Sequence, residues 1–117
     1  MKFLKYLKEG DTSDYIKMVA TFRKSGSKPA GFKYGCIEEY IDDKGKSMGD
    51  RSPESDNYKK GTMRECFRNA FRLASEKGFE YCEGYATNII PTLHAWCLDK
   101  GKVIDITWSK GRDYHGV

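Results

Sequence analysis

One segment constrains the fold of this chain more than any other, because residues 62–78 have the composition and period of an amphipathic helix. Residues 62–65 read Thr-Met-Arg-Glu, a capping-box pattern that predicts Thr62 as the N-cap and Glu65 as the third helical residue. Gly78 follows as a typical C-terminal stop. Apolar or small residues recur between them at helical spacing: Met63, Cys66, Phe67, Ala70, Phe71 and Ala74. The fold must therefore cover one apolar helix face.

Three strands are expected after this helix, over residues 79–86, 93–98 and 103–108. The last two are separated by Asp-Lys-Gly-Lys at positions 99–102, a strong signal for a β-hairpin. One clear helix followed by an antiparallel meander predicts an α+β fold, in which the cysteine-bearing helix packs on a small sheet.

The first half of the chain is less regular. Residues 13–24 read as a helix capped by Ser13, which gives the fold an N-terminal helical part. Residues 32–41 begin with alternating apolar side chains, and we expect a strand there. Residues 42–60 turn polar and are expected to form one long loop that is either mobile or part of a binding rim. The 117 residues are too few for two domains, so we expect a single domain over residues 1–117.

Charge and hydropathy restrict the function classes. No stretch approaches the roughly 20 apolar residues that a membrane-spanning helix needs, and lysines interrupt residues 1–8, so no secretory signal is expected. These features predict a cytoplasmic protein with no membrane partner. The net charge of +4 comes from residues 1–28, which carry seven Lys or Arg against three Asp or Glu. We interpret this surplus as a solvated helical surface, and a nucleic-acid partner as the least favoured reading.

Four cysteines and two histidines limit the metal and disulfide chemistry. Without a secretory signal, reduced thiols are favoured over disulfides for a domain of this size. There is no paired C-x-x-C motif, so neither a metal nor another cofactor is expected. Cys82 and Cys97 fall in expected strands and are interpreted as small core residues.

Cys66 has a position that favours reactivity. The capping box puts it in the first turn of its helix, where backbone N–H groups are unpaired and the helix dipole is positive. Both effects favour the thiolate, and the same N–H groups suit an oxyanion on a substrate carbonyl. The alternative is a buried helical cysteine, because Cys66 also lies on the apolar stripe.

The expected hairpin brings a histidine and a carboxylate together. If Lys100 and Gly101 are the two loop residues, then Asp105 becomes the diagonal neighbour of His94 on one face, within side-chain reach. A carboxylate beside a histidine fixes its tautomer and supports its charged form. Taken singly, His94 could be a half-buried structural histidine and Asp105 a surface residue, but the pair on one face favours chemistry.

The order of these residues resembles the core of transglutaminase-like and papain-like cysteine enzymes. In those proteins a cysteine begins a helix, a histidine follows in a strand as H-A-W, and an aspartate comes in the next strand as D-x-T. The corresponding residues are Cys66, 94–96 and 105–107, and the match covers about residues 60–108. The runs 66–70, 83–86 and 114–117 are also similar to small proteins of bacteriophages and bacteria.

The resemblance implies a role for each residue. Cys66 would be the nucleophile, His94 the general base and acid, and Asp105 the group that orients the histidine. The candidate substrate-binding residues are Asn69, Tyr85 and Trp96, and for Asn69 and Trp96 a purely structural role is the alternative. The segment before Cys66 lacks the glycine or glutamine forms of better-known relatives, so the side-chain member of an oxyanion hole is unassigned, with Asn57 and Tyr58 as candidates.

Three functions follow from these observations. The leading hypothesis is a thiol-dependent acyl-transfer enzyme that acts on an amide or ester bond of a small molecule or protein, as a hydrolase or an amine transferase. The second is a catalytically silent binding module of the same fold, such as a phage-encoded antagonist of a host protein or a pocket for a small ligand. The third is a nucleic-acid partner bound through the basic N-terminus.

Overall fold

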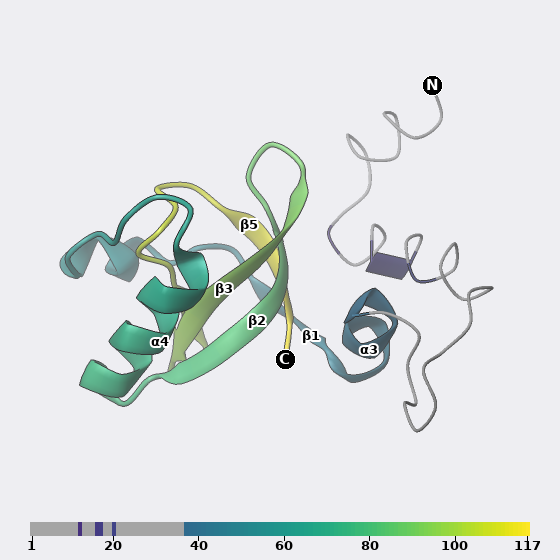
Figure 1. Ribbon diagram of the computed structural model, residues 1–117, viewed down its shortest axis with the longest axis horizontal. Coiled ribbons are helices and arrows are strands. Elements are labelled where there is room, and N and C mark those ends of the chain that lie inside the picture. Colours follow the sequence, from purple (N-terminus) through teal and green to yellow (C-terminus); the bar gives the residue numbers. More distant parts are fainter. Residues whose placement is uncertain (1–11, 13–15, 18–19, 21–36) are drawn as a thin grey trace.

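The computed structural model describes residues 12, 16, 17, 20 and 37–117 of the protein, which form a small α+β domain (Figure 1). Its helices are α3 (Ile37–Lys44), the 3-10 helix η1 (Pro53–Asn57) and α4 (Cys66–Lys77). Its strands are β1 (Lys46–Gly49), β2 (Glu80–Thr87), β3 (Pro91–Asp99), β4 (Lys102–Ile104) and β5 (Arg112–Gly116). No helix in these residues is long and apolar enough to cross a membrane.

The five strands form one antiparallel sheet in the order β1-β5-β2-β3-β4. The sheet curls until its two edges meet, because Arg51, just after β1, forms a bridge with Val103 of β4. The N–H of Ser52 adds a hydrogen bond of 2.8 Å to the carbonyl of Val103. The curl protects both edge strands from pairing with other chains.

Two apolar clusters lie on opposite faces of this sheet. Helix α4 covers one face, where its Ala70 and Leu73 pack on Ala95, Cys97, Ile104 and Ile106. The inside of the curl holds Cys82, Ala86, Trp96, Leu98, Val103 and Tyr114, with Met48 and Trp108 against them. Cys82 and Cys97 are therefore buried in separate clusters, as the sequence predicted.

The hairpin of β3 and β4 has the predicted register. Asp99 pairs with Lys102, and Cys97 pairs with Ile104. Lys100 and Gly101 form the turn with positive φ angles of 51° and 81°, which suits a two-residue hairpin. The second strand is shorter than the expected 103–108, because it ends at Ile104.

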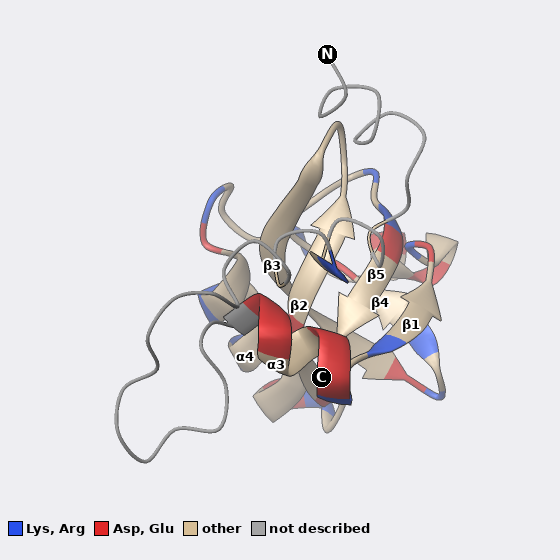
Figure 2. Ribbon diagram, turned by 90° about the vertical axis from the view of Figure 1, so that its right-hand side faces the viewer, with Lys and Arg blue, Asp and Glu red and all other residues tan. Residues whose placement is uncertain are grey.

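The strand expected over residues 32–41 is wrong where the structure describes it. Ile37–Lys44 is a helix, with glutamates in its first turn and Lys44 in its last, as the helix dipole favours. Acidic residues are concentrated on this helix (Figure 2). Its buried Ile41 packs against Tyr85 and Ile16. Residues 32–36, which carried the alternating pattern, lie outside the described residues.

The single loop expected over residues 42–60 is also wrong. The segment contains the end of α3, strand β1 and η1, which begins after the capping residue Ser52. Strand β1 is too polar and exposed to show alternation, and its pairing with the distant strand β5 supplies its hydrogen bonds. The expected helix over 13–24 lies mostly outside the described residues, although 16, 17 and 20 are helical.

Helix α4 begins later than the capping box predicted. Its N-cap is Glu65, which makes no side-chain capping bond, and Cys66 is its first residue. Arg64 has a φ of 69°, so the chain turns sharply just before the helix, and Thr62 cannot cap it. The buried face is shifted too, because Asn69, Ala70 and Leu73 point inward and Met63, Phe67 and Phe71 are exposed. Gly78 ends the helix in the left-handed conformation, as predicted.

Candidate active site

The turn after β4 is built on the carboxylate of Asp105. Its Oδ1 accepts hydrogen bonds from the backbone N–H groups of Thr107 at 2.8 Å and Trp108 at 3.1 Å. An aspartate that binds the backbone two and three residues ahead favours a turn over a strand. This local bonding explains why the strand stops at Ile104.

The second carboxylate oxygen of Asp105 points into the curl of the sheet. Oδ2 accepts from Nε2 of His94 at 2.7 Å and from the hydroxyl of Tyr114 at 2.6 Å. Asp105 and His94 are each 1% exposed. Burial alone would raise the pKa of Asp105, but the bonds and charge of His94, with Tyr114 and the Trp108 N–H, hold it below its usual value. The carboxylate is thus ionised and fixed.

The backbone of Asp105 is also held from outside the hairpin. Its N–H donates to the hydroxyl of Ser55 at 3.0 Å, and that hydroxyl donates to the carbonyl of Val103 at 3.3 Å. Nε of Arg51 donates to the carbonyl of Asp105 at 3.2 Å. Residues between β1 and α4 therefore position the carboxylate of a residue some 50 positions later.

Cys66 approaches His94 where β4 has ended. In the β3–β4 ladder the N–H groups of Cys97 and Asp99 point toward β4, and the N–H of Ala95 points the same way. A longer strand would have offered Ala95 the carbonyl of Ile106, but that carbonyl accepts from the N–H of Gly61 at 2.9 Å. The N–H of Ala95 donates to the Cys66 sulfur instead.

The Cys66 thiol is half-buried, and the His94 side chain beside it lowers its pKa. Because Nε2 of His94 is held by Asp105, its other nitrogen, Nδ1, is the one available to the sulfur. The imidazole thus lies between the other two side chains, hydrogen-bonded to Asp105 and in electrostatic interaction with Cys66. The structure brings together the three residues that the sequence analysis named as catalytic.

The electrostatics of this array favour a charged pair. Burial would raise the pKa of Cys66, but the hydrogen bond and charge of His94, with the N–H groups of Ala95 and Phe67, lower it below the ordinary thiol value. Burial would lower the pKa of His94, but Asp105 and Cys66 raise it above the ordinary value for histidine. Both shifts favour the thiolate–imidazolium form of the pair over the neutral thiol–imidazole form.

Trp108 covers the imidazole. Its ring is stacked on His94 with centroids 3.7 Å apart and planes 11° from parallel. The face of an indole attracts a cation, so this contact supports the charged form of His94 and limits the rotation of its ring.

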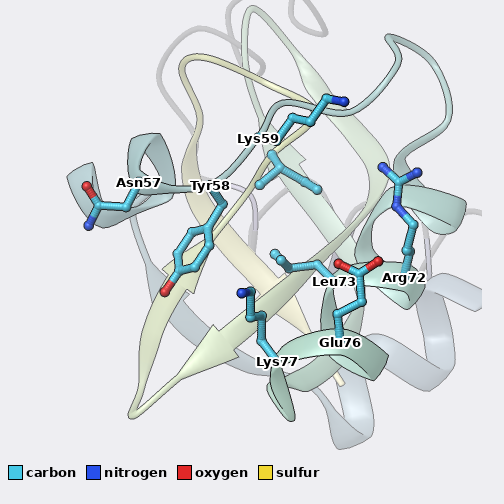
Figure 3. Close-up of a pocket in the computed structure, with 8 residues that line it drawn as sticks. Asn57, Tyr58, Lys59, Arg72, Leu73, Glu76 and Lys77 are labelled. Atoms are coloured by element: carbon cyan, nitrogen blue, oxygen red, sulfur yellow. The ribbon is translucent and has the colours of Figure 1, made fainter.

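The start of α4 supplies backbone donors beside the sulfur. The N–H of Asn69 bonds the carbonyl of Glu65 at 2.9 Å and begins the helical pattern, so the N–H groups of the first turn precede it. The Phe67 N–H faces the sulfur. Asn57 and Tyr58, considered as oxyanion residues, lie elsewhere: they line a pocket of about 400 Å³ with Glu76 and Lys77, at the opposite end of α4 (Figure 3).

The three residues named as substrate-binding are buried and have partners within the protein. Asn69 donates to the carbonyl of Thr62 at 2.8 Å and to the hydroxyl of Thr107 at 2.9 Å. Trp96 donates to the sulfur of Met48 at 3.3 Å. The hydroxyl of Tyr85 donates to Glu38 at 2.6 Å. In this structure Asn69 joins the helix to the loop of Asp105, and none of the three side chains is exposed for a substrate to contact.

Three residues of the site were not identified from the sequence. Ser55 and Arg51 stand in a polar segment with no motif, and only the bridge between the sheet edges brings them to Asp105. Tyr114 belongs to β5, which pairs with the distant strands β1 and β2.

Searches against family models, curated proteins and solved structures found no match for the chain.

Proposed function

We propose that the protein is a thiol-dependent acyl-transfer enzyme that acts on an amide or ester bond. The observation that supports it best is the position of His94, whose Nε2 lies 2.7 Å from the Asp105 carboxylate and whose side chain also lowers the pKa of the Cys66 thiol. An imidazole between a thiol and a buried carboxylate is the arrangement that activates a cysteine nucleophile.

The proposed reaction has two steps. The Cys66 thiolate attacks the carbonyl carbon, and the first-turn N–H groups of α4 stabilise the oxyanion. The C–N or C–O bond then breaks, and the His94 imidazolium gives its proton to the leaving amine or alcohol. Water or an amine next attacks the thioester, His94 takes the proton of that nucleophile, and Cys66 is released as the thiolate beside the imidazolium.

The proposed fold family is the transglutaminase-like and papain-like core, in a reduced form. The support is the cysteine at the start of α4, the histidine on β3 and the aspartate directly after β4, in the order that the family has. A cytoplasmic setting is part of the proposal, since a reducing compartment keeps a reactive thiol free.

The test is acetylation and alkylation of Cys66. Brief treatment with 4-nitrophenyl acetate should release nitrophenolate and leave an acetyl group on Cys66, identified by peptide mass spectrometry. Iodoacetamide should alkylate Cys66 near pH 6.5 faster than it alkylates N-acetylcysteine, because more of the Cys66 thiol is ionised there. Absence of acetylation, together with labelling no faster than that of the free thiol, would contradict the proposal.

A further inference from the structure

Two side chains of β2 lie beside the Cys66 thiol without belonging to the set of Cys66, His94 and Asp105. Glu83 is the direct cross-strand partner of Ala95, whose N–H donates to the sulfur of Cys66. Directly opposed residues share one face of a sheet, so the side chain of Glu83 lies on the face that α4 covers. Tyr81, two residues earlier, lies on the same face and contacts Phe71 of α4, with ring centroids 6.2 Å apart.

Tyr81 and Glu83 form a hydrogen-bonded pair. The hydroxyl of Tyr81 donates to Oε1 of Glu83 at 2.7 Å, which leaves Oε2 to accept from another group. Burial, then the hydrogen bond to Glu83 and its charge, and then the charge of Cys66 raise the pKa of Tyr81, so the hydroxyl stays protonated and keeps donating. Within the part of the chain that the structure describes, Glu83 has no lysine or arginine partner.

A carboxylate in this position does not assist the nucleophile. A negative charge near a thiol disfavours the thiolate, so Glu83 carries no charge that would support the ionisation of Cys66. It also takes no part in holding His94 or Asp105. Its orientation by Tyr81 therefore suggests a role toward a group that arrives with the substrate.

The surface around this carboxylate is apolar. Phe67 and Phe71 lie one helical turn apart on the same side of α4 and are 41% and 66% exposed. Leu93, the residue before His94, is 37% exposed and lies on the same face of the sheet as Ala95. An oriented carboxylate among aromatic rings suits a cation carried on an aliphatic or aromatic chain.

We infer that Tyr81 and Glu83 form a specificity subsite that binds a positively charged group of the substrate, while Phe67 and Phe71 contact the apolar chain that carries it. The inference rests on the proposed function, since it concerns the substrate of Cys66. It names the substrate class as an amide or ester with an ammonium or guanidinium group a short chain away from the carbonyl.

A matched pair of substrates tests the subsite. The 4-nitrophenyl esters of 4-(trimethylammonio)butyrate and 5,5-dimethylhexanoate have the same shape and differ in one charge. The native protein should have a kcat/KM for the cationic ester about fivefold above that for the neutral ester, after each is divided by its rate with N-acetylcysteine. In the Glu83→Gln variant this ratio should fall to about one, and Tyr81→Phe should lower it partly.

Glu80→Gln is the control variant. Glu80 lies on the same strand, with its side chain on the opposite face, and it is exposed. The substitution removes the same charge from the protein but not from the face of Cys66. The ratio should therefore stay at its native value, whereas an equal fall in both variants would indicate a general effect of net charge and overturn the subsite.

A second measurement needs no turnover. The cationic reagent 2-(trimethylammonio)ethyl methanethiosulfonate and its neutral analogue, 3,3-dimethylbutyl methanethiosulfonate, both react with a thiolate, which attacks the sulfenyl sulfur, forms a disulfide and expels methanesulfinate. Cys66 should prefer the cationic reagent about fivefold relative to free thiol, and Glu83→Gln should abolish the preference. Ester turnover with no charge preference would overturn the subsite alone. A charge preference in labelling without any turnover would contradict the proposed function and retain the subsite.

Discussion

The two ends of the Cys66–His94–Asp105 array are built differently. Asp105 is buried and accepts hydrogen bonds from two side chains and two backbone N–H groups. Cys66 is half-buried at the first residue of a helix and lies between exposed apolar side chains. Under the proposed function this difference is a division of roles, in which the carboxylate end fixes the geometry and the thiol end stays accessible.

The largest effect is expected at the open end. Cys66→Ala should lower ester turnover by at least about a thousandfold, because the nucleophile is lost. The free energy of unfolding, measured in urea, should change by about 1 kcal/mol or less, since the side chain is small and only half-buried. A large loss of stability would show that Cys66 is mainly a core residue and would remove the contrast between the two ends.

At the buried end, substitution of Asp105 should lower both the stability and the turnover. In Asp105→Asn the new NH2 group faces the Tyr114 hydroxyl and the His94 N–H. All three groups are hydrogen-bond donors, so neither of the two original hydrogen bonds can form. We expect a loss of about 3 kcal/mol of unfolding free energy, as for other broken buried pairs, and turnover reduced by about a thousandfold or more. Urea unfolding and ester kinetics on the same preparation measure both.

The pH dependence of the stability provides the control. The pKa of Asp105 is lower in the folded protein than in the unfolded chain. Its stabilising contribution is therefore complete above its unfolded value of about 3.9 and is lost as the pH falls through the folded value. The native protein should lose more stability between pH 5 and pH 3 than Asp105→Asn does. Equal losses would show that the carboxylate is not stabilised by folding.

The same contrast explains what the sequence could predict. A two-residue turn fixes the register of its hairpin, so the nearness of His94 to Asp105 followed from local rules. The contact of Cys66 with His94 depends on where β4 stops and on Gly61 occupying the carbonyl of Ile106. Both are consequences of tertiary structure, and only the family resemblance had suggested that contact.

The errors in the sequence analysis have a common cause. The apolar stripe predicts Phe67 and Phe71 as buried, whereas the buried face contains Asn69, which donates to Thr62 and Thr107. Strands β1 and β5 were missed because each is short and polar, and their pairing joins distant segments. Such strands form because they pair with residues distant in the sequence, and a short stretch of sequence does not reveal that pairing.

Gly61, in the loop before Cys66, allows a test of the contact by which Asn69 joins α4 to the loop of Asp105. A Cβ added to Gly61 would lie 2.2 Å from Cγ of Asn69, so Gly61→Ala must displace the side chain that joins α4 to Thr107. We expect a loss of about 2 kcal/mol of unfolding free energy. In the Asn69→Ala background the same change should cost much less, because the space is vacated. An equal loss of unfolding free energy in both backgrounds would show that the added methyl group clashes with a group other than Asn69.

The smallest effect is expected at Tyr114, which donates to Asp105 from inside the curl of the sheet. Tyr114→Phe keeps the ring in its cluster and removes only the hydroxyl that donates to Oδ2 at 2.6 Å. A hydrogen bond to a charged group contributes about 1.5 kcal/mol, so the stability should fall by about that amount. Turnover should fall only several-fold, because His94 and two backbone N–H groups still hold the carboxylate.

Tyr58→Phe is the matched control for that substitution. Tyr58 packs on the cluster beneath α4, with Phe79 at 5.6 Å between ring centroids, and no hydrogen bond of its hydroxyl is found within the described chain. Removal of the Tyr58 hydroxyl should change neither the unfolding free energy nor the turnover appreciably. If Tyr114→Phe behaves like Tyr58→Phe, the carboxylate is fixed by the turn and His94 alone, and the rigidity of the buried end is a property of residues 105–108 rather than of the whole curled sheet.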